Sequence, residues 1–419
     1  MCRPFALVGR PRSRGASSLP RVALACLILL CAFSTAAAQE LPSGPITAFD
    51  GRLVVGAEVS ASVGSSDENA YFNYTDYEHN ALRLFRAAVA ASWRPASRIA
   101  LVGEVRTEDF NLVRPYAAYV RIRPWSGIDF DIQAGQIPPS FGAYGRRGYQ
   151  SNDNGLIGYP LAYQYLTAMR ADAAPASLAD LLAMRARGWR LSYPLGSQQA
   201  GPGVPLISAF RWDTGVQGHW HGRMIDVTAG VTSGTLSDPH VEDNNSGKQF
   251  SGRVALSPIT GLIVGASTAR GEFLAKAVTR QLQDTPGSRA QTALGADAEY
   301  SRDHWLVRGE MVWSRWNVPM VATRSSIDLD AIGYWIEGRY RLTPRIVVAA
   351  RADRLDFSDV PLGSGATDTW DANVRRVEAD AGYYFRRNLV FRVAVQHNDR
   401  DGGRDRKRTY VSGQLAYWF

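Results

Sequence analysis

The chain ends in TYVSGQLAYWF, residues 409–419, a segment in which apolar and polar side chains alternate. Val411, Leu415, Tyr417 and Phe419 fall on one face of this segment. Successive side chains of a β-strand point to opposite faces, so a period of two predicts a strand with one apolar and one polar side. An aromatic residue at the end of such a strand is unusual for a soluble domain, whose terminal residues tend to be polar and frayed.

This segment resembles the closing strand of Gram-negative outer-membrane β-barrels. In those proteins a terminal aromatic residue and alternating apolar residues form the signal that the barrel-assembly machinery binds. The matching positions here are Val411, Leu415, Tyr417 and Phe419, and Gly413 departs from the pattern. The resemblance implies a barrel in the outer membrane and the assembly machinery as a partner.

The other end of the chain has the order of charge, apolar core and small residues that is typical of a secretory signal. Residues 1–21 contain five arginines and no acidic residue, residues 22–33 are mostly apolar, and residues 36–38 are alanines. The apolar core is too short to span a bilayer. We therefore predict a signal peptide over residues 1–38 and a single mature domain over residues 39–419.

The composition of the predicted mature domain excludes several function classes. All three cysteines, Cys2, Cys26 and Cys31, lie in the signal, so the mature domain would have no disulfide, thiolate metal site or cysteine nucleophile. Loss of the five arginines lowers the formal charge from +8 to +3, which gives little support to nucleic-acid binding. A lipoprotein anchor is the alternative, but Cys26 follows too few apolar residues and Cys31 follows a bulky leucine.

Alternating segments continue through almost the whole mature domain, which has no apolar run long enough for a membrane helix. We count sixteen such segments, each with an apolar face and a face rich in charge. They lie at 51–63, 81–94, 98–109, 113–125, 127–137, 206–219, 223–233, 248–257, 260–270, 290–301, 304–316, 328–342, 345–356, 373–386, 389–398 and 407–419.

The connections between these segments alternate between short and long. Seven short turns and eight longer connections are what sixteen antiparallel strands require when both termini lie on one side. Outer-membrane barrels have an even strand number, short periplasmic turns and longer external loops. We therefore predict an all-β fold, a transmembrane antiparallel β-barrel of about sixteen strands. The long connections are near 64–80, 138–205, 234–247, 271–289, 317–327, 357–372 and 399–406, with a tighter one near 110–112.

Two other folds also fit part of the pattern. A soluble β-sandwich or propeller would alternate in the same way, but the signal, the uneven connections and Phe419 together disfavour it. A transporter with a plug domain is disfavoured because only residues 39–49 precede the first segment.

The fold class then suggests a function. Lipid cannot hydrogen-bond to backbone amides, so the sheet must close on itself with its polar face inward, and about sixteen strands enclose an aqueous channel. We predict an outer-membrane porin for passive diffusion of small hydrophilic solutes or ions, with no cofactor. The charged positions expected to face the lumen are Glu104, Arg106, Arg121, Arg123, Asp129, Asp131, Asp226, Arg253, Arg308, Glu310, Glu337, Arg339, Arg351, Asp353, Glu378, Asp380 and Arg392.

These charges have two interpretations. They form either a hydrated, salt-bridged wall with little selectivity, since an exposed pair contributes only ~0–1 kcal/mol, or a transverse electric field across a constriction. Arg121 and Arg123 beside Asp129 and Asp131 are the best local candidates for such a field.

The longest loop, residues 138–205, is where a constriction would form, because loops of this length are usually functional or disordered. Its aromatic content argues against disorder. Within it, Ser177 to Arg187 predicts a short helix with Ser177 as N-cap, Asp180 at the third position and Gly188 at the end. We expect this loop to fold over or into the pore; the alternative is an external cap on the neighbouring loops.

The start of this loop carries a narrower resemblance. Gly135-Gln136, Pro138 or Pro139, and Phe141-Gly142 resemble a motif of the phosphate- and polyphosphate-selective porin family. That family's anion selectivity rests on stacked arginines with lysines, whereas this chain has three lysines and interleaves acids with its arginines. Arg146 and Arg147 are the positions that the resemblance connects to anion binding.

No catalytic or metal-binding motif is evident. The six histidines are scattered and no Gly-x-Ser-x-Gly nucleophile turn is present. His219 and His221 would share a strand face, but no third metal ligand is visible. Residues 152–155 and 242–245 superficially suggest calcium loops but lack the terminal Glu and the spacing, so turn chemistry explains them better.

Two other classes remain open, an outer-membrane hydrolase and a structural or adhesive barrel that the long loop closes. Beyond the assembly machinery, the partners expected are outer-membrane lipid and lipopolysaccharide, the permeating solutes and ions, and further copies of the chain in a homotrimer.

Overall fold

Sixteen antiparallel strands, each paired with the next along the chain, form the wall of a closed β-barrel in the computed structural model. The last strand returns to the first: Ser60 of the first strand lies opposite Ala416 of the last. The structure describes residues 41–67, 72–75, 80–145, 155–208, 210–241, 245, 247–363, 365–403 and 405–419. The predicted signal, residues 1–38, lies outside them, and Ser43–Phe419 form one compact unit.

Each of the sixteen predicted segments overlaps one barrel strand. The strands are β2 (Leu53–Gly64), β3 (Phe85–Ala96), β4 (Ile99–Glu108), β5 (Arg114–Ile122), β6 (Phe130–Ile137), β9 (Asp213–His221), β10 (Ile225–Thr232), β11 (Gln249–Ile259), β12 (Leu262–Glu272), β13 (Ala290–Arg302), β14 (Trp305–Met320), β15 (Ser325–Arg341), β16 (Ile346–Phe357), β19 (Val374–Arg386), β20 (Leu389–Arg400) and β21 (Lys407–Trp418).

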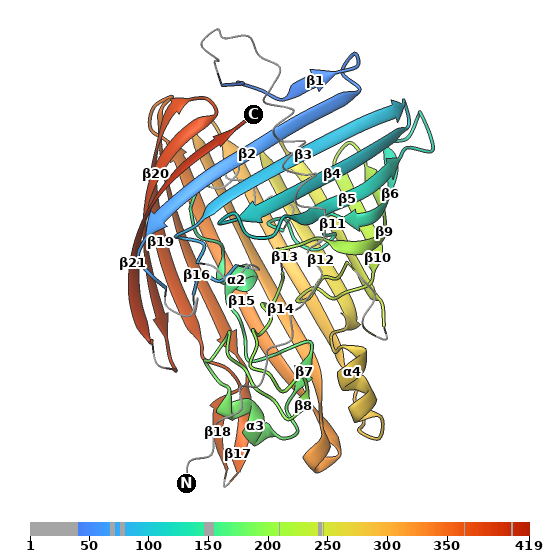
Figure 1. The fold of residues 1–419 in the computed structure, drawn as a ribbon, viewed down its shortest axis with the longest axis vertical. Coiled ribbons are helices and arrows are strands. Elements are labelled where there is room, and N and C mark those ends of the chain that lie inside the picture. Colours follow the sequence, from blue (N-terminus) through green and yellow to red (C-terminus); the bar gives the residue numbers. More distant parts are fainter. Residues whose placement is uncertain are drawn as a thin grey trace, which may run out of the picture. The chain divides into compact units, whose positions relative to one another are not determined.

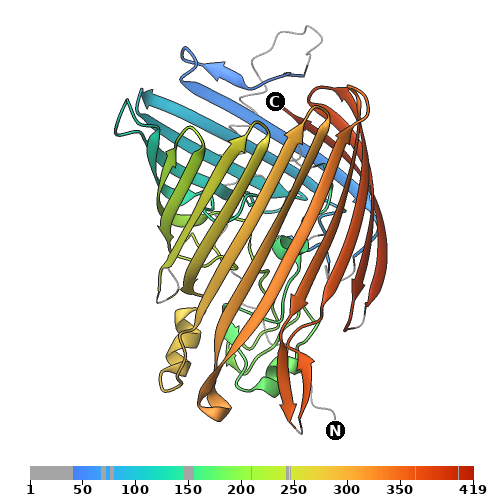
Figure 2. The same ribbon diagram turned by 180° about the vertical axis from the view of Figure 1, so that it is seen from behind.

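The wall is uneven in height (Figures 1 and 2). Strands β14 and β15 have 16 and 17 residues, whereas β5 and β6 have 9 and 8. The short turns and the C-terminus lie at one end of the barrel, and the long connections lie at the other. A short strand, β1 (Ile46–Ala48), pairs with the start of β2 at the short-turn end.

The outer face of the barrel is apolar, as the alternation predicts. On β19, Val377, Tyr383 and Phe385 are 58%, 39% and 53% exposed, while Glu378 between them is buried. On β21, Val411 and Leu415 point outward and Gln414 is buried. A closed sheet with this outer surface satisfies all its backbone groups internally and presents hydrocarbon to lipid.

Among the described residues, no helix is both long and apolar enough to cross a membrane. The helices are short: α2 (Leu161–Gln164) and α3 (Leu178–Ala183) lie in the long loop, and α4 (Lys276–Thr279), continued by η2 (Arg280–Leu282), follows β12. A further turn, η3 (Val321–Thr323), connects β14 to β15.

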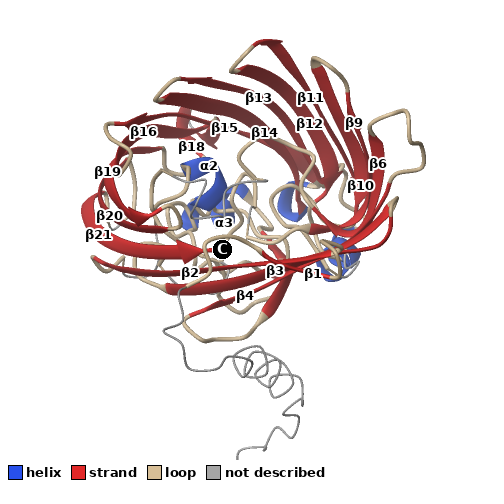
Figure 3. Ribbon diagram, turned by 90° about the horizontal axis from the view of Figure 1, so that it is seen from above, coloured by secondary structure: helices blue, strands red, loops and turns tan. Residues whose placement is uncertain are grey.

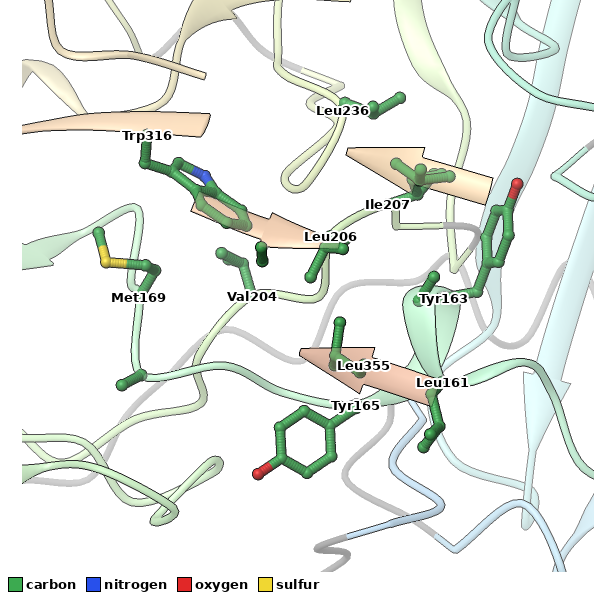
Figure 4. Close-up of a cluster of buried hydrophobic side chains, with 14 of the residues drawn as sticks. Leu161, Tyr163, Tyr165, Met169, Val204, Leu206, Ile207, Leu236, Trp316 and Leu355 are labelled. Atoms are coloured by element: carbon green, nitrogen blue, oxygen red, sulfur yellow. The ribbon is translucent and has the colours of Figure 1, made fainter. Parts of the chain in front are cut away.

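The long loop folds into the barrel. Seen along the barrel, α2 and α3 lie inside the ring of strands (Figure 3). Leu161, Tyr163 and Tyr165 pack with Trp316 and Leu355 of the wall in one buried apolar cluster (Figure 4). The interior of the barrel is therefore a packed core at this level, which confirms that the loop folds into the pore.

Three boundaries differ from those predicted. Of residues 206–212, predicted as the start of a strand, Leu206 and Ile207 belong to the buried cluster inside the barrel, and β9 begins only at Asp213. The region 357–372, predicted as a loop, contains a hairpin of β17 (Asp359–Gly363) and β18 (Ala366–Thr369), and the long loop contains a two-residue pair, β7 (Ala173–Ala174) and β8 (Leu195–Gly196).

The helix in the long loop begins as predicted and ends early. Ser177 is the N-cap, and its side chain and that of Asp180 form a reciprocal capping box. The helix ends with Met184 as its C-cap, four residues before Gly188.

Candidate pore constriction

Charged side chains cover the inner wall, and most of them are buried beneath the long loop. The charged inward positions of β14 to β20 with less than about a tenth of their surface exposed are Arg308, Glu310, Glu337, Arg351, Asp353, Arg376, Glu378, Asp380, Arg392 and Arg400. In an open, wide channel such side chains would be exposed to water. Their burial shows that the loop narrows the lumen along this side of the barrel.

Arg351 is the centre of an ion-pair network within that wall. Its guanidinium lies 2.9 Å from both Asp353 and Glu378 and 3.6 Å from Glu337. Arg308 reaches the same Glu337 at 2.9 Å. A buried charge is tolerated only when it is paired and hydrogen-bonded, and each of these three acids has an arginine nitrogen within 2.9 Å.

The loop is attached to this wall through Glu310 of β14. One carboxylate oxygen accepts a hydrogen bond from the Tyr163 hydroxyl at 2.6 Å, and the other accepts one from the backbone N–H of Ala143 at 3.2 Å. Two points of the loop that are twenty residues apart thus meet on one wall carboxylate. We call this contact the Glu310 latch.

A second attachment lies on β19. Glu378 accepts a hydrogen bond from the backbone N–H of Gly158 at 2.8 Å, and Arg376 donates to the carbonyl of Tyr159 at 2.8 Å and to the side chain of Gln164 at 3.2 Å. From β3, which is four strands along the wall from β19, Arg86 donates to the Tyr159 hydroxyl. Strands β3 and β19 therefore both hold this part of the loop.

Glycines provide the space for this close approach. A Cβ on Gly295 of β13 would lie 2.8 Å from the ring of Phe141, and a Cβ on Gly333 of β15 would lie 3.0 Å from Ala162. These two wall positions therefore accept the start of the loop and helix α2.

The connection between β2 and β3 also enters the lumen. Asp67 accepts hydrogen bonds from the backbone N–H groups of Phe72 and Asn73 and from the Tyr410 hydroxyl. The Asn73 side chain donates to Gln396 of β20 at 3.0 Å. A second segment thus adds to the constriction on the β20–β21 side.

At the long-loop end, Asp371 joins the loop to the segment after the β17–β18 hairpin. Its buried carboxylate accepts hydrogen bonds from the backbone N–H groups of Ala168, Ala186 and Ala372 at 2.6, 2.8 and 2.7 Å. Burial raises the pKa of Asp371 to about 6, against the opposing effect of these three donors.

The short-turn end is more open. A cavity of about 460 Å³ there is lined by Ser301, Arg339, Arg341 and Tyr384, among other residues. Arg339 is half-buried and Arg341 is exposed. The structure therefore has a charged vestibule at this end and a loop-filled constriction beyond it.

The predicted field between two arginines and two aspartates is not assembled as one unit. Arg121 of β5 and Asp131 of β6 are wall residues, whereas Arg123 and Asp129 lie in the turn between these strands with about half of each side chain exposed. The turn pair is 3.8 Å apart, so it belongs to the rim of the barrel.

Other predicted wall residues pair with neighbours. Arg106 contacts Glu104 at 2.7 Å and lies over the ring of Tyr116, and Arg253 contacts Asp297 at 2.5 Å. Their role in a constriction stays a prediction. Arg146 and Arg147 lie outside the described residues.

Asp226 lies 2.8 Å from His219, which also approaches Asp131 at 3.5 Å. Within the part of the chain that the structure describes, no group of three or more His, Cys, Asp or Glu side chains is arranged to hold a metal ion.

Sequence reasoning missed several residues that shape the constriction. Arg86, Arg376 and Arg400 are buried wall arginines that contact the inward segments, and Tyr159 and Tyr163 are the loop residues that bind wall charges. Alternation alone places the three arginines on the inner face. It does not say which of them the loop reaches.

Among known proteins, only solved structures are similar to this chain. No protein-family model matches the sequence, and no curated protein does. Solved structures do match. The outer membrane channel DcaP of Acinetobacter baumannii has a TM-score of 0.52 at 10% identity over 90% of this chain and 100% of that chain.

Two further solved structures match to the same degree. OmpF of Salmonella typhi, in complex with daunomycin, has a TM-score of 0.52 at 12% identity over 88% of this chain and 97% of its own. An anion-selective porin from Comamonas acidovorans has a TM-score of 0.52 at 8% identity over 88% and 99% of the two chains.

The class follows from the closed sixteen-stranded wall, the apolar outer belt and the loop folded inside. This protein is a transmembrane-type antiparallel β-barrel. More narrowly, it has the fold of the outer-membrane porins.

Proposed function

We propose that this protein is a diffusion porin whose narrow, charged passage admits small hydrophilic solutes and ions. The observation that carries the proposal is the long loop held inside a closed barrel by hydrogen bonds to wall charges. Such a loop reduces the lumen of a sixteen-stranded barrel to a constriction and lines it with fixed charge. The vestibule at the short-turn end leads toward it.

Planar-bilayer recording of the purified, folded protein tests this proposal. The full chain should give discrete steps of small conductance. A variant in which residues 139–207 are replaced by a short Gly-Ser linker should give steps several-fold larger, because the linker leaves the lumen unobstructed. Heat-modifiable gel mobility of both proteins controls for a folded barrel.

A barrel closed by its loop is the second candidate, and the burial of the wall charges favours it. The same experiment separates the two. A full chain without current above the lipid background, together with a conducting loop-deleted variant, would replace the porin by a closed structural barrel.

Selectivity is a separate part of the proposal. Reversal potentials in a salt gradient report whether anions or cations pass more easily. If Arg146 and Arg147 line the passage, their replacement by glutamine should lower the preference for anions. An unchanged reversal potential would remove them from the passage.

A hydrolase remains the alternative of another class. Loss of a lipid- or peptide-hydrolysing activity on His219→Ala would support it. In the structure His219 of β9 has carboxylates near both ring nitrogens, which is an ion-pair arrangement.

We also propose that the barrel associates into homotrimers through the outer face of β2 to β6. At the end of β4, the tight loop exposes Phe110, Leu112 and Val113, which are 80%, 64% and 47% accessible. Exposed apolar surface of this kind marks an interaction site. OmpT of Vibrio cholerae, which matches this chain with a TM-score of 0.51 at 12% identity over 88% and 99% of the two chains, has been solved in a trimer form.

A further inference from the structure

The vestibule cavity at the short-turn end combines positive charge with apolar surface. Its volume of about 460 Å³ is within the usual range for sites that hold a small organic molecule. Two inward arginines of β15, Arg339 and Arg341, line it together with Leu306 of β14 and Val347 of β16. Arg339 is half-buried and Arg341 is exposed.

The strand register places apolar residues, not acids, directly opposite these two arginines. Arg339 lies opposite Leu306 and Ala349, and Arg341 lies opposite Val347. Residues two positions apart on a strand share a face, and their Cα atoms are about 6.6 Å apart. Both guanidinium groups can therefore reach a single oxyanion, which would also compensate the repulsion between them.

The inward row one step deeper in the barrel has a different arrangement. There Arg308 lies opposite Glu337, and Glu337 lies opposite Arg351. Glu337 is 2.9 Å from Arg308 and 3.6 Å from Arg351. The deeper row compensates its own charge, so the vestibule is the level at which a bound anion would add the missing negative charge.

One acid also lines the cavity. The side chain of Asp303, in the turn between β13 and β14, is 78% exposed and lies 3.8 Å from Arg302 of the same turn. Asp303 thus has a cationic neighbour of its own, and the two arginines of β15 remain as a surplus of positive charge.

We infer that the vestibule binds a small organic anion with an apolar body, such as an aromatic carboxylate. The carboxylate lies between Arg339 and Arg341, with the Tyr384 hydroxyl as a further donor at the edge of the cavity. The apolar body lies against Leu306 and Val347, which an inorganic anion would leave uncovered. The short turns of such barrels face the periplasm, so the ligand enters from that side.

This inference does not rest on the proposed function. The cavity lies at the short-turn end of the barrel, before the constriction that the long loop forms. A barrel closed by its loop would have the same cavity, so loss of binding and loss of conductance are separate results.

A ¹⁹F NMR titration of 4-fluorobenzoate with the detergent-purified full chain tests the site. Arg341→Gln should weaken binding about fivefold, the usual effect of removing one exposed charged partner. Arg345→Gln is the matched control, because Arg345 is an exposed arginine at the same end of the barrel and donates to the hydroxyl of the outward Tyr383 at 3.4 Å. Its affinity for 4-fluorobenzoate should equal that of the native chain.

Two further probes separate charge from apolar contact. Trifluoroacetate carries the same charge without a ring and should bind roughly tenfold more weakly than 4-fluorobenzoate, because it buries much less apolar surface. 4-Fluorobenzyl alcohol carries the ring without the charge, so its signal should be the same with the native chain and with Arg341→Gln.

Three results would overturn the site. The first is an unchanged affinity of Arg341→Gln for 4-fluorobenzoate, with heat-modifiable mobility showing a folded barrel. The second is an equal loss of affinity in Arg345→Gln, which would indicate the general charge of the barrel rim. The third is trifluoroacetate binding as tightly as 4-fluorobenzoate, which would indicate a site for any anion.

Discussion

Gly142 shows how one residue sets the position of the long loop. Its φ is +70°, and a Cβ there would lie 2.2 Å from a Glu310 carboxylate oxygen and 2.8 Å from the Tyr163 hydroxyl. Glycine is thus required both by the backbone conformation and by the close approach to the Glu310 latch. The Phe141-Gly142 part of the motif noted in the sequence has this structural role.

Gly142→Ala should loosen the latch. The strained backbone and the displaced carboxylate together should cost about 1–3 kcal/mol of local stability, seen as faster hydrogen exchange of the Ala143 amide and as added noise in the open-channel current. Gly338→Ala in β15 is the control, since a Cβ there meets nothing within 4 Å. Equal rates of hydrogen exchange at the Ala143 amide in Gly142→Ala and Gly338→Ala would contradict the role given to Gly142.

Asp371 makes the junction at the long-loop end sensitive to pH. Its pKa in the folded protein is about 6, above its usual value of 3.8, so the native state holds a proton more tightly than the unfolded chain does. Stability from this group is therefore greatest below about pH 4 and decreases by up to about 3 kcal/mol as pH rises to 6. Above about pH 6 the contribution of Asp371 to stability stays constant.

The exchange of the Ala168 and Ala186 amides, corrected for intrinsic rates, checks this sign. Protection should fall between pH 4 and 6 in the native chain, and Asp371→Asn should remove that dependence. A variant with the same pH profile as the native chain would show that another group titrates.

At the scale of elements, the sequence pattern predicts the strands of the barrel wall but not the packing of the segments inside it. All sixteen strands were predictable because a face in lipid and a face in the lumen force alternation over eight or more residues. Residues 206–212 belong to the alternating segment 206–219 and are predicted as the start of a strand, yet Leu206 and Ile207 pack inside the barrel. Alternation reports which face a residue takes, and only the fold reports what covers that face.

The same limit explains why the sequence pattern does not predict the contacts that form the constriction. The capping box at Ser177 was predictable because its partners are three residues apart. The contact between Tyr163 and Glu310 joins residues 147 positions apart, and no local pattern identifies such a pair.

The long loop should behave as a fixed element during conduction. Ser140 of the loop and Ser251 of β11 approach within 2.5 Å through their hydroxyl oxygens, so Ser140→Cys with Ser251→Cys should form a disulfide in the barrel. Oxidised and reduced protein should conduct equally, because the bond holds the loop where the hydrogen bonds already hold it. Planar-bilayer recording before and after dithiothreitol measures this, with Ser140→Cys alone as the control. Larger current steps on reduction would show that the loop moves.

At the scale of the whole molecule, the barrel has two different outer sides. The tall side, β14 to β21, ends in a charged edge, as expected where a membrane gives way to headgroups and water. On the low side, β3 to β6, the apolar surface continues to Phe110 at the long-loop end. An apolar surface that extends beyond the membrane edge requires another cover, and further copies of the chain are the cover that we propose.

Ala87→Arg on the outer face of β3 tests that proposal, with Ala350→Arg on the outer face of β16 as its matched control. Each arginine replaces an outward alanine within the apolar band, so each should cost roughly 2–4 kcal/mol if it faced lipid near the midplane. At a subunit interface the β3 arginine must in addition lie between two packed barrels, where a charge without a partner is far more costly. We therefore expect light scattering in mild detergent to report trimers for the native chain and for Ala350→Arg, and monomers for Ala87→Arg. Trimers that survive Ala87→Arg but dissociate with Ala350→Arg would place the interface on the tall side and leave the low side to lipid.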